Sequence, residues 1–339
     1  MLFRSVFSTV RAAAAVALLA SLSLAGGAGW LADYDEAVKV AKTEKKDLFV
    51  DFTGSDWCGW CMKLDKEVFS HDEFLNEIKK DYVLLALDYP HGDEAKKKVP
   101  NEKRNAELQQ LHGIQGFPTI LLMNSDGVVY GQTGYQAGGP EKYVEHVKGL
   151  RTKGRASLDR YQGLADAWKK AKDAAKGAAW DEVVKTFEAE RGDSRAATLL
   201  VPTIREALTF DPTNAQGRKL RAMQVLVSAG LADDGLLTEA RTLDPKNEKG
   251  LLERVVLAQF EKVRSPDAAR AAVAELDALV ALGARKDKKT DFLLHLNAAW
   301  LCNGALSDAE RAKKYAKTAK DVGTDDARLS QILEQILNG

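Results

Sequence analysis

Up to about residue 150, the chain alternates short apolar runs with stretches that have helical spacing. Four runs bounded by charged or turn-forming residues are predicted to be buried strands: 48–52, 82–87, 119–123 and 128–132. The last two flank Asp126-Gly127, a pair that indicates a hairpin. Helices are predicted at 34–45, 62–68, 72–80 and 140–150. The polar and charged segment 91–105 is predicted to be a solvated loop that leads into another helix, which ends near residue 111. The order β-α-β-α-β-β-α, with a helix in front, predicts a small α/β domain with a mixed sheet.

Past Arg151 the strand pattern stops, and apolar residues recur three and four positions apart. Helices are predicted at 158–175, 180–190, 195–208, 214–229, 234–241, 249–263, 266–282, 290–302, 308–321 and 327–337. The segment 207–214 is similar to 240–247, and both contain an Asp-Pro-x-Asn turn. The two segments are 33 residues apart, and this period and the shared turn resemble those of tetratricopeptide-like helical hairpins. We therefore expect an all-helical, repeat-like second domain with degenerate units.

The N-terminal segment has the order of a secretory signal peptide: Arg4 and Arg11, an apolar run over 12–24, then small residues. Cleavage is expected after Ala25 or Ala28. The apolar run is shorter than the roughly 20 residues of a membrane span, which favours a cleaved signal peptide over a membrane helix. No stable membrane insertion is expected after cleavage; an uncleaved anchor is the alternative. The predicted organisation is a signal peptide at 1–28, an α/β domain at 30–152 and a helical domain at 155–339. The protein is expected to be periplasmic or secreted.

Composition adds two constraints. Lys+Arg and Asp+Glu both number 49, so the formal net charge is zero and no nucleic-acid partner is expected. The three cysteines, Cys58, Cys61 and Cys302, are too few for a disulfide-stapled scaffold. In an exported chain, the close pair is better interpreted as reactive than as structural. Cys302 lies on an apolar predicted helix and is interpreted as a small buried hydrophobe.

The sequence Cys58-Gly59-Trp60-Cys61 lies between a predicted strand and a predicted helix. This position puts the first sulfur at a helix N-terminus, where free N–H groups and the helix dipole stabilise an anion. A free cysteine has a pKa of about 8.5, and such motifs commonly lower it to about 7 or below. Cys58 is therefore predicted to be the nucleophile and Cys61 the resolving thiol.

Other interpretations of the cysteine pair are weaker. A structural zinc site needs a second ligand pair, which the sequence does not offer. Covalent haem attachment needs a histidine after the second cysteine, where this chain has Met62. The histidines form no recognisable ligand set or triad: His71, His91, His112, His146 and His295. We expect no metal and no cofactor besides the redox-active disulfide, with an inert disulfide as the alternative.

The region from about residue 46 to residue 150 resembles thioredoxin, specifically the exported thioredoxin-like branch with a Trp-Cys-x-x-Cys-x-Lys pattern. One matching segment is Val50-Asp51-Phe52 ahead of Trp57-Cys58-Gly59-Trp60-Cys61, and the other is Gly113-Ile114-Gln115-Gly116-Phe117-Pro118-Thr119. The resemblance implies the thioredoxin fold, thiol–disulfide exchange and a cis peptide bond at Phe117–Pro118 facing the disulfide. It covers about a third of the chain and does not extend to the helical half.

The resemblance also implies roles for residues around the cysteines. Asp51 stands where the family has a buried carboxylate that accepts the proton of Cys61, although one extra residue before Cys58 weakens the match. A solvated strand-edge carboxylate is the alternative. A cis bond is energetically accessible only before proline, and cis Pro118 would leave backbone groups of its neighbours free to pair with an extended substrate. The residues expected to contact substrate are Trp57, Gly59, Trp60, Phe117 and Thr119; for the two tryptophans, core packing is the alternative.

The sequence carries less evidence for the direction of electron flow than for the exchange chemistry itself. Strong oxidants depend on extreme thiolate stabilisation, but Gly59 and Trp60 add no positive charge between the cysteines, and Asp56 opposes an anion nearby. Lys63 is interpreted as a surface residue. The sequence thus favours an exported reductase or isomerase that exchanges disulfides with protein substrates and a redox partner protein. The alternatives are an adaptor that binds its partner through the helical domain, and a redox sensor.

Overall fold

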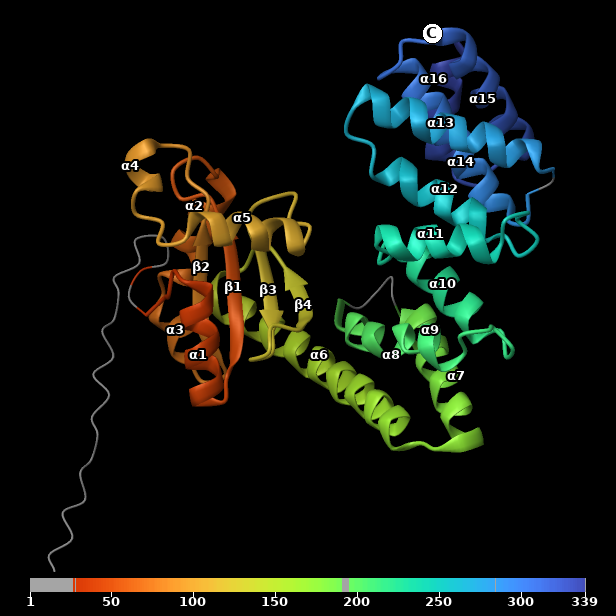
Figure 1. Ribbon diagram of the computed structural model, residues 1–339. Helices are drawn as coiled ribbons and strands as arrows, with labels where there is room; N and C mark the ends of the chain where they lie inside the picture. Colours follow the sequence, from red (N-terminus) through yellow and green to blue (C-terminus); the bar gives the residue numbers. More distant parts are fainter. Residues whose placement is uncertain (1–26, 28, 191–194, 284, 339) are drawn as a thin grey trace, which may run out of the picture. The chain divides into compact units, whose positions relative to one another are not determined.

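The computed structural model describes residues 27, 29–190, 195–283 and 285–338 (Figure 1). The predicted signal peptide and its cleavage sites therefore lie almost entirely outside the described residues. By their internal contacts the described residues form two compact units. The first reaches residue 158 and includes a short segment near residue 195; the second contains the rest of the chain from residue 159.

The first unit is built on one four-stranded sheet with the order β2-β1-β3-β4. Its strands are β1 (Asp47–Thr53), β2 (Tyr82–Asp88), β3 (Thr119–Met123) and β4 (Val129–Thr133). Strand β1 runs parallel to β2 and antiparallel to β3, and β3 and β4 form the antiparallel hairpin. The predicted mixed sheet is confirmed. Since β1 is central, every one of its residues is buried.

The helices of this unit are α1 (Tyr34–Glu44), α2 (Gly59–Leu64), the π-helical turn η1 (Asp65–Phe69), α3 (Asp72–Ile78), α4 (Asp93–Lys96), α5 (Glu102–Leu111) and the start of α6 (Gly139–Lys170). The short helix α4 lies within the segment predicted to be a loop. Helix α6 is continuous, whereas separate helices were predicted at 140–150 and 158–175. Gly154 lies inside α6 and does not end it. A Cβ at this position would be 2.3 Å from the ring of Tyr130, so the glycine allows close packing on β4.

Side chains alternate across the sheet, which gives it two different faces. On one face, Leu48, Val50 and Phe52 of β1 pack in a cluster with residues of α1 and α5: Ala37, Ala41 and Leu108. The other face is aromatic. There Phe49 contacts the rings of Trp30, Phe69, Phe74 and Tyr82, at centroid distances of 5.8, 5.6, 5.7 and 6.0 Å. Because Phe69 belongs to η1, the helix that follows the cysteine motif lies over this second face.

Two further contacts hold the sheet in place. Trp30 is 2% exposed, and the next residue, Leu31, exchanges backbone hydrogen bonds with Leu84 and Ala86 of β2, both at 2.9 Å. At the start of β1, the buried carboxylate of Asp47 accepts hydrogen bonds from Tyr130 at 2.7 Å and from Arg151 at 3.2 Å. The chain from Trp30 onward therefore belongs to the folded core.

All regular secondary structure in the described part of the second unit is helical. After the end of α6 it contains α7 (Asp173–Glu190), the 3-10 turn η2 (Arg195–Leu200, whose first residues group with the first unit), α8 (Val201–Arg205), α9 (Ala207–Phe210), α10 (Arg218–Ser228), α11 (Asp234–Leu243), α12 (Leu251–Glu261), α13 (Pro266–Ala281), α14 (Lys288–Asn303), α15 (Ala309–Val322) and α16 (Ala327–Asn338). The helix predicted at 195–208 is broken into short pieces, since Pro202 lacks the N–H that a continuous helix would need. No helix in the described ranges is long and apolar enough to cross a bilayer.

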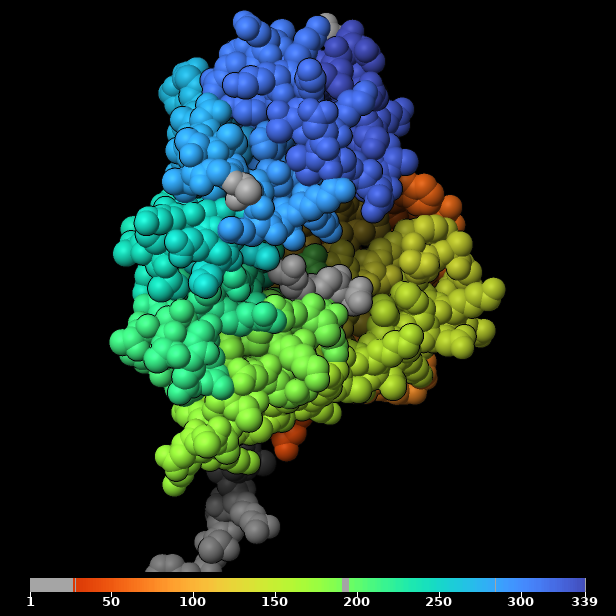
Figure 2. Space-filling view, turned by 90° about the vertical axis from the view of Figure 1, so that its right-hand side faces the viewer, coloured from red at the N-terminus to blue at the C-terminus, as the bar shows by residue number. Residues whose placement is uncertain are grey.

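Two turns of this unit share one geometry. The carboxylate of Asp211 accepts the backbone N–H of Arg218, and that of Asp244 accepts the N–H of Leu251, both at 2.9 Å. Asn214 and Asn247 both have positive φ, 57° and 56°. The two segments that are similar in sequence, 33 residues apart, therefore also have the same turn structure. Within the helical unit the colours change gradually from the green of α7 to the blue of α16, and α12 contacts both α13 and α14 (Figures 1 and 2).

Candidate active site

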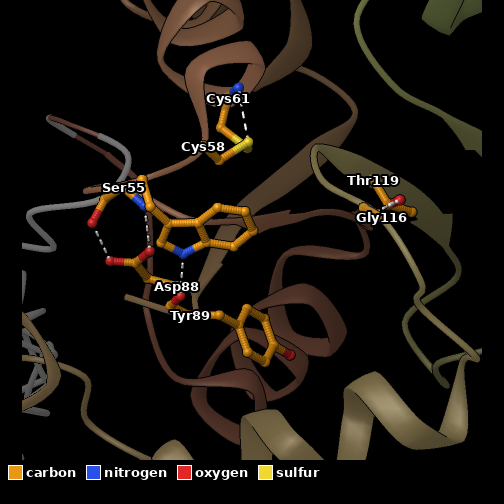
Figure 3. Close-up of a disulfide and its surroundings, with 8 residues drawn as sticks. Ser55, Cys58, Cys61, Asp88, Tyr89, Gly116 and Thr119 are labelled. Atoms are coloured by element: carbon orange, nitrogen blue, oxygen red, sulfur yellow. Dashed lines mark hydrogen bonds between the residues drawn. A yellow bond between two sulfur atoms is a disulfide. The ribbon is translucent and has the colours of Figure 1, made fainter. Parts of the chain in front are cut away.

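The two cysteines of the motif form a disulfide directly after the central strand. Their sulfurs are 2.04 Å apart and their Cα atoms 5.2 Å apart, and each residue is 5% exposed. Cys58 is the N-cap of α2, and its sulfur accepts the backbone N–H of Cys61 at 3.2 Å (Figure 3). The first backbone N–H groups of a helix have no intrahelical partner, so they can stabilise negative charge on this sulfur. The geometry therefore suits a reactive thiolate at Cys58 in the reduced state.

Trp57 connects the cysteine motif to two other loops. Its indole N–H donates to the carbonyl of Tyr89 at 2.8 Å, and its ring meets Phe117 edge to face with centroids 5.5 Å apart. The ring also covers Gly54 so closely that a Cβ there would lie 2.6 Å from it. Trp57 is nevertheless 40% exposed. It is therefore both a packing residue of the active-site loop and part of the accessible surface, so the two roles considered from the sequence coexist.

The residues before Trp57 are held by the loop that follows β2. Both the backbone N–H and the hydroxyl of Ser55 donate to the carboxylate of Asp88, at 2.9 and 2.6 Å (Figure 3). The carboxylate of Asp56 accepts the N–H groups of Gly92, at 2.7 Å, and of His91, at 3.0 Å. These hydrogen bonds, that of Gly92 first, lower the pKa of Asp56. The negative charge of Asp56 is thus stabilised by the backbone N–H groups of residues 91 and 92.

The peptide bond between Phe117 and Pro118 is cis, in agreement with the expectation from the thioredoxin resemblance. Phe117 contacts the rings of both Trp57 and Tyr89, at centroid distances of 5.5 and 5.3 Å, which places this loop beside the cysteine motif. The hydroxyl of Thr119 donates to the carbonyl of Gly116 at 2.8 Å, closing the loop around the proline (Figure 3).

Trp60 forms a second aromatic surface next to the disulfide. It is 57% exposed, and its ring is tilted against Tyr135 with centroids 5.1 Å apart. The ammonium of Lys63 lies 5.1 Å from the Trp60 ring and 4.9 Å from the Tyr135 ring, while the hydroxyl of Tyr135 donates to Glu67 at 2.6 Å. Gly59, the first residue of α2, is exposed at the same site. Tyr135 was not identified from the sequence, because it follows β4 and meets Trp60 only through the fold.

Asp51 is buried, not solvated at a strand edge. Burial raises the pKa of Asp51 to about 8, and the charges of Asp65 and Asp88 act in the same direction. Its Oδ1 has no hydrogen-bond partner among the described residues. Alternation along β1 puts Asp51 on the same face as Phe49, and Phe49 packs on Phe69 of η1, the turn that directly follows α2 and Cys61. A protonated carboxyl near neutral pH can exchange a proton with a neighbouring thiol.

The third cysteine is not part of this constellation. Cys302 is a free, buried residue of α14 in the helical unit, and burial raises the pKa of its thiol. A thiol in such surroundings is unreactive, in agreement with its interpretation as a small hydrophobe.

Comparisons with known proteins identify the family of the first unit. A family profile described as a thioredoxin-like domain matches residues 34–148. The chain is 32% identical over 117 residues to "Disulfide bond reductase DsbH" of Chlamydia pneumoniae, covering 34% of this chain and 68% of that protein. It is also 32% identical over 98 residues to "Thioredoxin-related protein DsbJ" of the same organism, covering 29% of this chain but only 27% of that protein. A solved structure named "DsbH Oxidoreductase" aligns at 26% identity and a TM-score of 0.32, over 39% of this chain and 91% of that one.

Proposed function

This chain belongs to the thioredoxin-like family of thiol–disulfide oxidoreductases, and from that premise we propose that it reduces or isomerises disulfides of exported proteins through Cys58 and Cys61. The observation that carries the proposal is the sulfur of Cys58 at the start of α2, bonded to the N–H of Cys61. The reductase direction is supported by the name of the relative DsbH, and export by the signal-peptide pattern of residues 1–28.

In the first step, the Cys58 thiolate attacks one sulfur of a substrate disulfide. The new Cys58–substrate bond forms as the substrate S–S bond breaks, and the departing substrate thiolate takes a proton from solvent. The helix N-terminus stabilises the attacking thiolate before this step. When a second substrate thiolate attacks the substrate sulfur of the mixed disulfide, as in isomerisation, Cys58 is the leaving group, and its low pKa makes it depart faster.

In the second step, Cys61 resolves the mixed disulfide. Its thiol gives a proton to ionised Asp51, its sulfur attacks the sulfur of Cys58, and the substrate leaves as a second thiolate. Two electrons have then passed from the dithiol to the substrate, and the Cys58–Cys61 disulfide has formed again. A dithiol redox partner protein must reduce it before the next cycle. Asp51 fits this role because its raised pKa is close to that of a thiol.

Substrate would lie across the exposed edge beside the disulfide. The aromatic rings of Trp57 and Trp60 offer apolar contact area, and Gly59 leaves the approach to the sulfurs open. The backbone of Phe117 and Thr119, on either side of cis Pro118, would bind an extended segment of the substrate chain. Backbone recognition of this kind is indifferent to side chains, so it suits an enzyme that acts on several proteins.

The test is insulin reduction with a dithiol as electron donor. We expect turnover by the native protein, none above background for Cys58→Ser, and accumulation of a mixed disulfide for Cys61→Ser. Cys302→Ala is the matched control and should retain full turnover, because that thiol is buried and free. Absence of any Cys58-dependent exchange would contradict the proposal.

The reduction potential of the cysteine pair decides the direction of electron flow. A value near that of thioredoxin, about −270 mV, supports a reductase, whereas a value near that of the strongest oxidants of this fold, about −120 mV, contradicts it.

A further inference from the structure

Two adjoining cavities in the helical unit form one polar groove along α10. A cavity of about 410 Å³ lies between α7 and α10, and a second of about 270 Å³ lies between α7, α10 and α12. Arg221 and Gln224 line both cavities. We call this continuous depression the α10 groove.

The arginines of the α10 groove follow the helical repeat. Arg221 and Arg254 are 33 positions apart, the same offset that separates the turn residues Asp211 and Asp244. Arg221 belongs to α10 and Arg254 to α12, the helices that begin directly after those two turns. Equivalent positions in successive hairpins face the same side of a helical stack, so the repeat places one arginine per hairpin along the groove.

The charge of the groove is positive, although the chain as a whole is neutral. Four cationic side chains line it (Lys185, Arg218, Arg221, Arg254) against two carboxylates (Asp181, Glu188). Arg218 forms two hydrogen bonds with Asp181, at 3.1 and 2.9 Å, and Arg221 donates to Glu188 at 2.6 Å. Arg254 donates to the hydroxyl of Ser228, so its partner there carries no charge. Lys185 pairs with Glu182 at 3.7 Å. These contacts hold the guanidinium groups in position and leave a net positive charge of one among the groups named, which Arg254 carries.

We propose that the α10 groove binds an extended acidic segment of a protein partner, whose carboxylates contact Arg221 and Arg254. Guanidinium groups pair with carboxylates through two parallel hydrogen bonds, which gives such a contact both strength and direction. The groove walls are helices, whose backbone groups are already bonded internally, so side chains must supply the recognition. This function is separate from disulfide exchange, because it involves none of the residues near Cys58.

The spacing of the arginines indicates the conformation of the partner. Helices in contact lie about 8–10 Å apart, which sets the step between the equivalent arginines of α10 and α12. A polyproline II chain advances about 9.3 Å in each three-residue turn. Acidic side chains three positions apart in that conformation would therefore meet both arginines. A pre-formed polyproline II segment also loses little conformational entropy on binding.

The test is fluorescence anisotropy of a labelled fifteen-residue peptide of Glu-Pro-Pro repeats, titrated with the purified full-length protein. The comparison peptides are Lys-Pro-Pro repeats and a chain of Glu-Pro repeats, in which the acidic spacing is different. We expect the Glu-Pro-Pro peptide to bind most tightly, and its affinity to fall with rising salt. Equal affinity for the Lys-Pro-Pro peptide, or no binding at millimolar protein, would overturn the proposal.

Variants distinguish the groove from other basic surface. Losing one charge-assisted hydrogen-bonded contact should weaken binding about tenfold, so Arg221→Gln with Arg254→Gln should weaken it about a hundredfold. The Lys–Lys double variant should be intermediate. Arg270→Gln, at an exposed position of α13 outside the groove, should match the native protein. Unchanged peptide affinity in the Gln–Gln variant would refute the site. If the native protein bound a DNA oligonucleotide more tightly than the Glu-Pro-Pro peptide, and the Gln–Gln variant lost that DNA binding, the proposed class of partner would be refuted.

Two controls keep these outcomes clear. Far-ultraviolet circular dichroism must show native helix content in each variant. If the Gln–Gln variant does not fold, the Lys–Lys variant, which keeps the charges but changes their geometry, decides the test. Native-like affinity of the Lys–Lys variant for the peptide would refute bidentate recognition. Cys58-dependent reduction of bis(2-hydroxyethyl) disulfide should be equal in all arginine variants. A protein that loses peptide binding but retains this reduction supports the groove independently of the proposed enzyme function.

Discussion

The imidazole of His91 stacks face to face on the indole of Trp57, with ring centroids 4.6 Å apart and 6° between the planes. The backbone N–H of His91 also donates to Asp56, at 3.0 Å. Because Trp57 immediately precedes Cys58, residue 91 helps to hold the loop that carries the nucleophile. The sequence had placed His91 at the start of a solvated loop, so this contact changes the role of the segment after β2.

The His91 stack predicts a measurable effect on the active-site loop. Replacing His91 by Ala should destabilise the first unit by about 1 kcal/mol, because an aromatic pair is lost. His91→Phe is the matched control, since it retains the stack. Urea unfolding of both variants, followed by tryptophan fluorescence, measures the difference. Equal stability of the Ala and Phe variants would mean that the stack contributes nothing.

Asp51 predicts a pH dependence of stability. Its folded pKa is raised to about 8 from 3.8, so between about pH 4 and pH 8 the native state holds a proton that the unfolded chain has released. Stability should therefore fall as pH rises through this window, by up to about 1.4 kcal/mol per pH unit, and the loss is complete above the folded pKa. Asp51→Asn removes the effect and should gain stability relative to the native protein from pH 5 to pH 9. Parallel denaturation midpoints across this range would contradict the raised pKa.

The same substitution predicts a change in the reaction. Without a carboxylate to take the proton of Cys61, Asp51→Asn should slow release of a trapped mixed disulfide, while formation of that disulfide by Cys58 proceeds at the native rate. Stopped-flow measurement of the two steps separates these outcomes. If both steps slow equally, Asp51 supports the structure of the site and not the resolving step.

The contact of Tyr130 with Asp47 predicts the cost of removing one of the hydrogen-bond donors to a buried carboxylate. The tyrosine hydroxyl donates to this carboxylate at 2.7 Å. Tyr130→Phe should lower the free energy of unfolding by about 1–3 kcal/mol, since one acceptor site of the carboxylate then stays desolvated. Tyr135→Phe, which breaks a bond to the accessible carboxylate of Glu67, is the comparison and should change stability much less. Chemical denaturation of both variants makes the test.

Trp30 predicts where the folded chain must begin. Its side chain is buried against Phe49 and Phe69. Trp30→Ala should cost about 3–5 kcal/mol, as for other large core residues, whereas Trp60→Ala should change stability little because Trp60 is mostly exposed. Cleavage after Ala25 or Ala28 leaves Trp30 in place. A protein starting at residue 32 that is as stable as one starting at residue 29 would contradict the assignment of Trp30 to the core.

The repeated turns predict equal effects at equivalent positions. Asp211→Ala and Asp244→Ala each remove a carboxylate that accepts backbone N–H groups at the start of the next helix. Each should destabilise the helical unit by about 1 kcal/mol, measured as a shift in thermal unfolding. Glu248→Ala, at an exposed position in the second turn, provides the control. A large effect at only one of the two aspartates would indicate that the turns are not energetically equivalent.

Residues close together in the chain made much of this protein predictable. Strands β1 to β4 could be assigned from short apolar runs, and the hairpin from Asp126-Gly127, because strand burial and turn geometry depend on a few neighbouring residues. The same holds for Cys58 and Cys61: four positions and a following helix are enough to bring two thiols together at a helix start. The two Asp-Pro-x-Asn turns were visible for the same reason.

Contacts between distant segments could be found only in the folded chain. His91 meets Trp57, and Tyr135 meets Trp60, although no local pattern marks His91 or Tyr135. Phe117 belongs to a recognisable motif, but its contact with Trp57 also depends on the fold. Gly154 of α6 packs against Tyr130 of β4, which leaves no room for a larger side chain at that position. Arg221 and Arg254 form a groove only once successive hairpins are stacked. Propensity and spacing act over a few residues, whereas these contacts depend on the path of the whole chain, which is determined by packing.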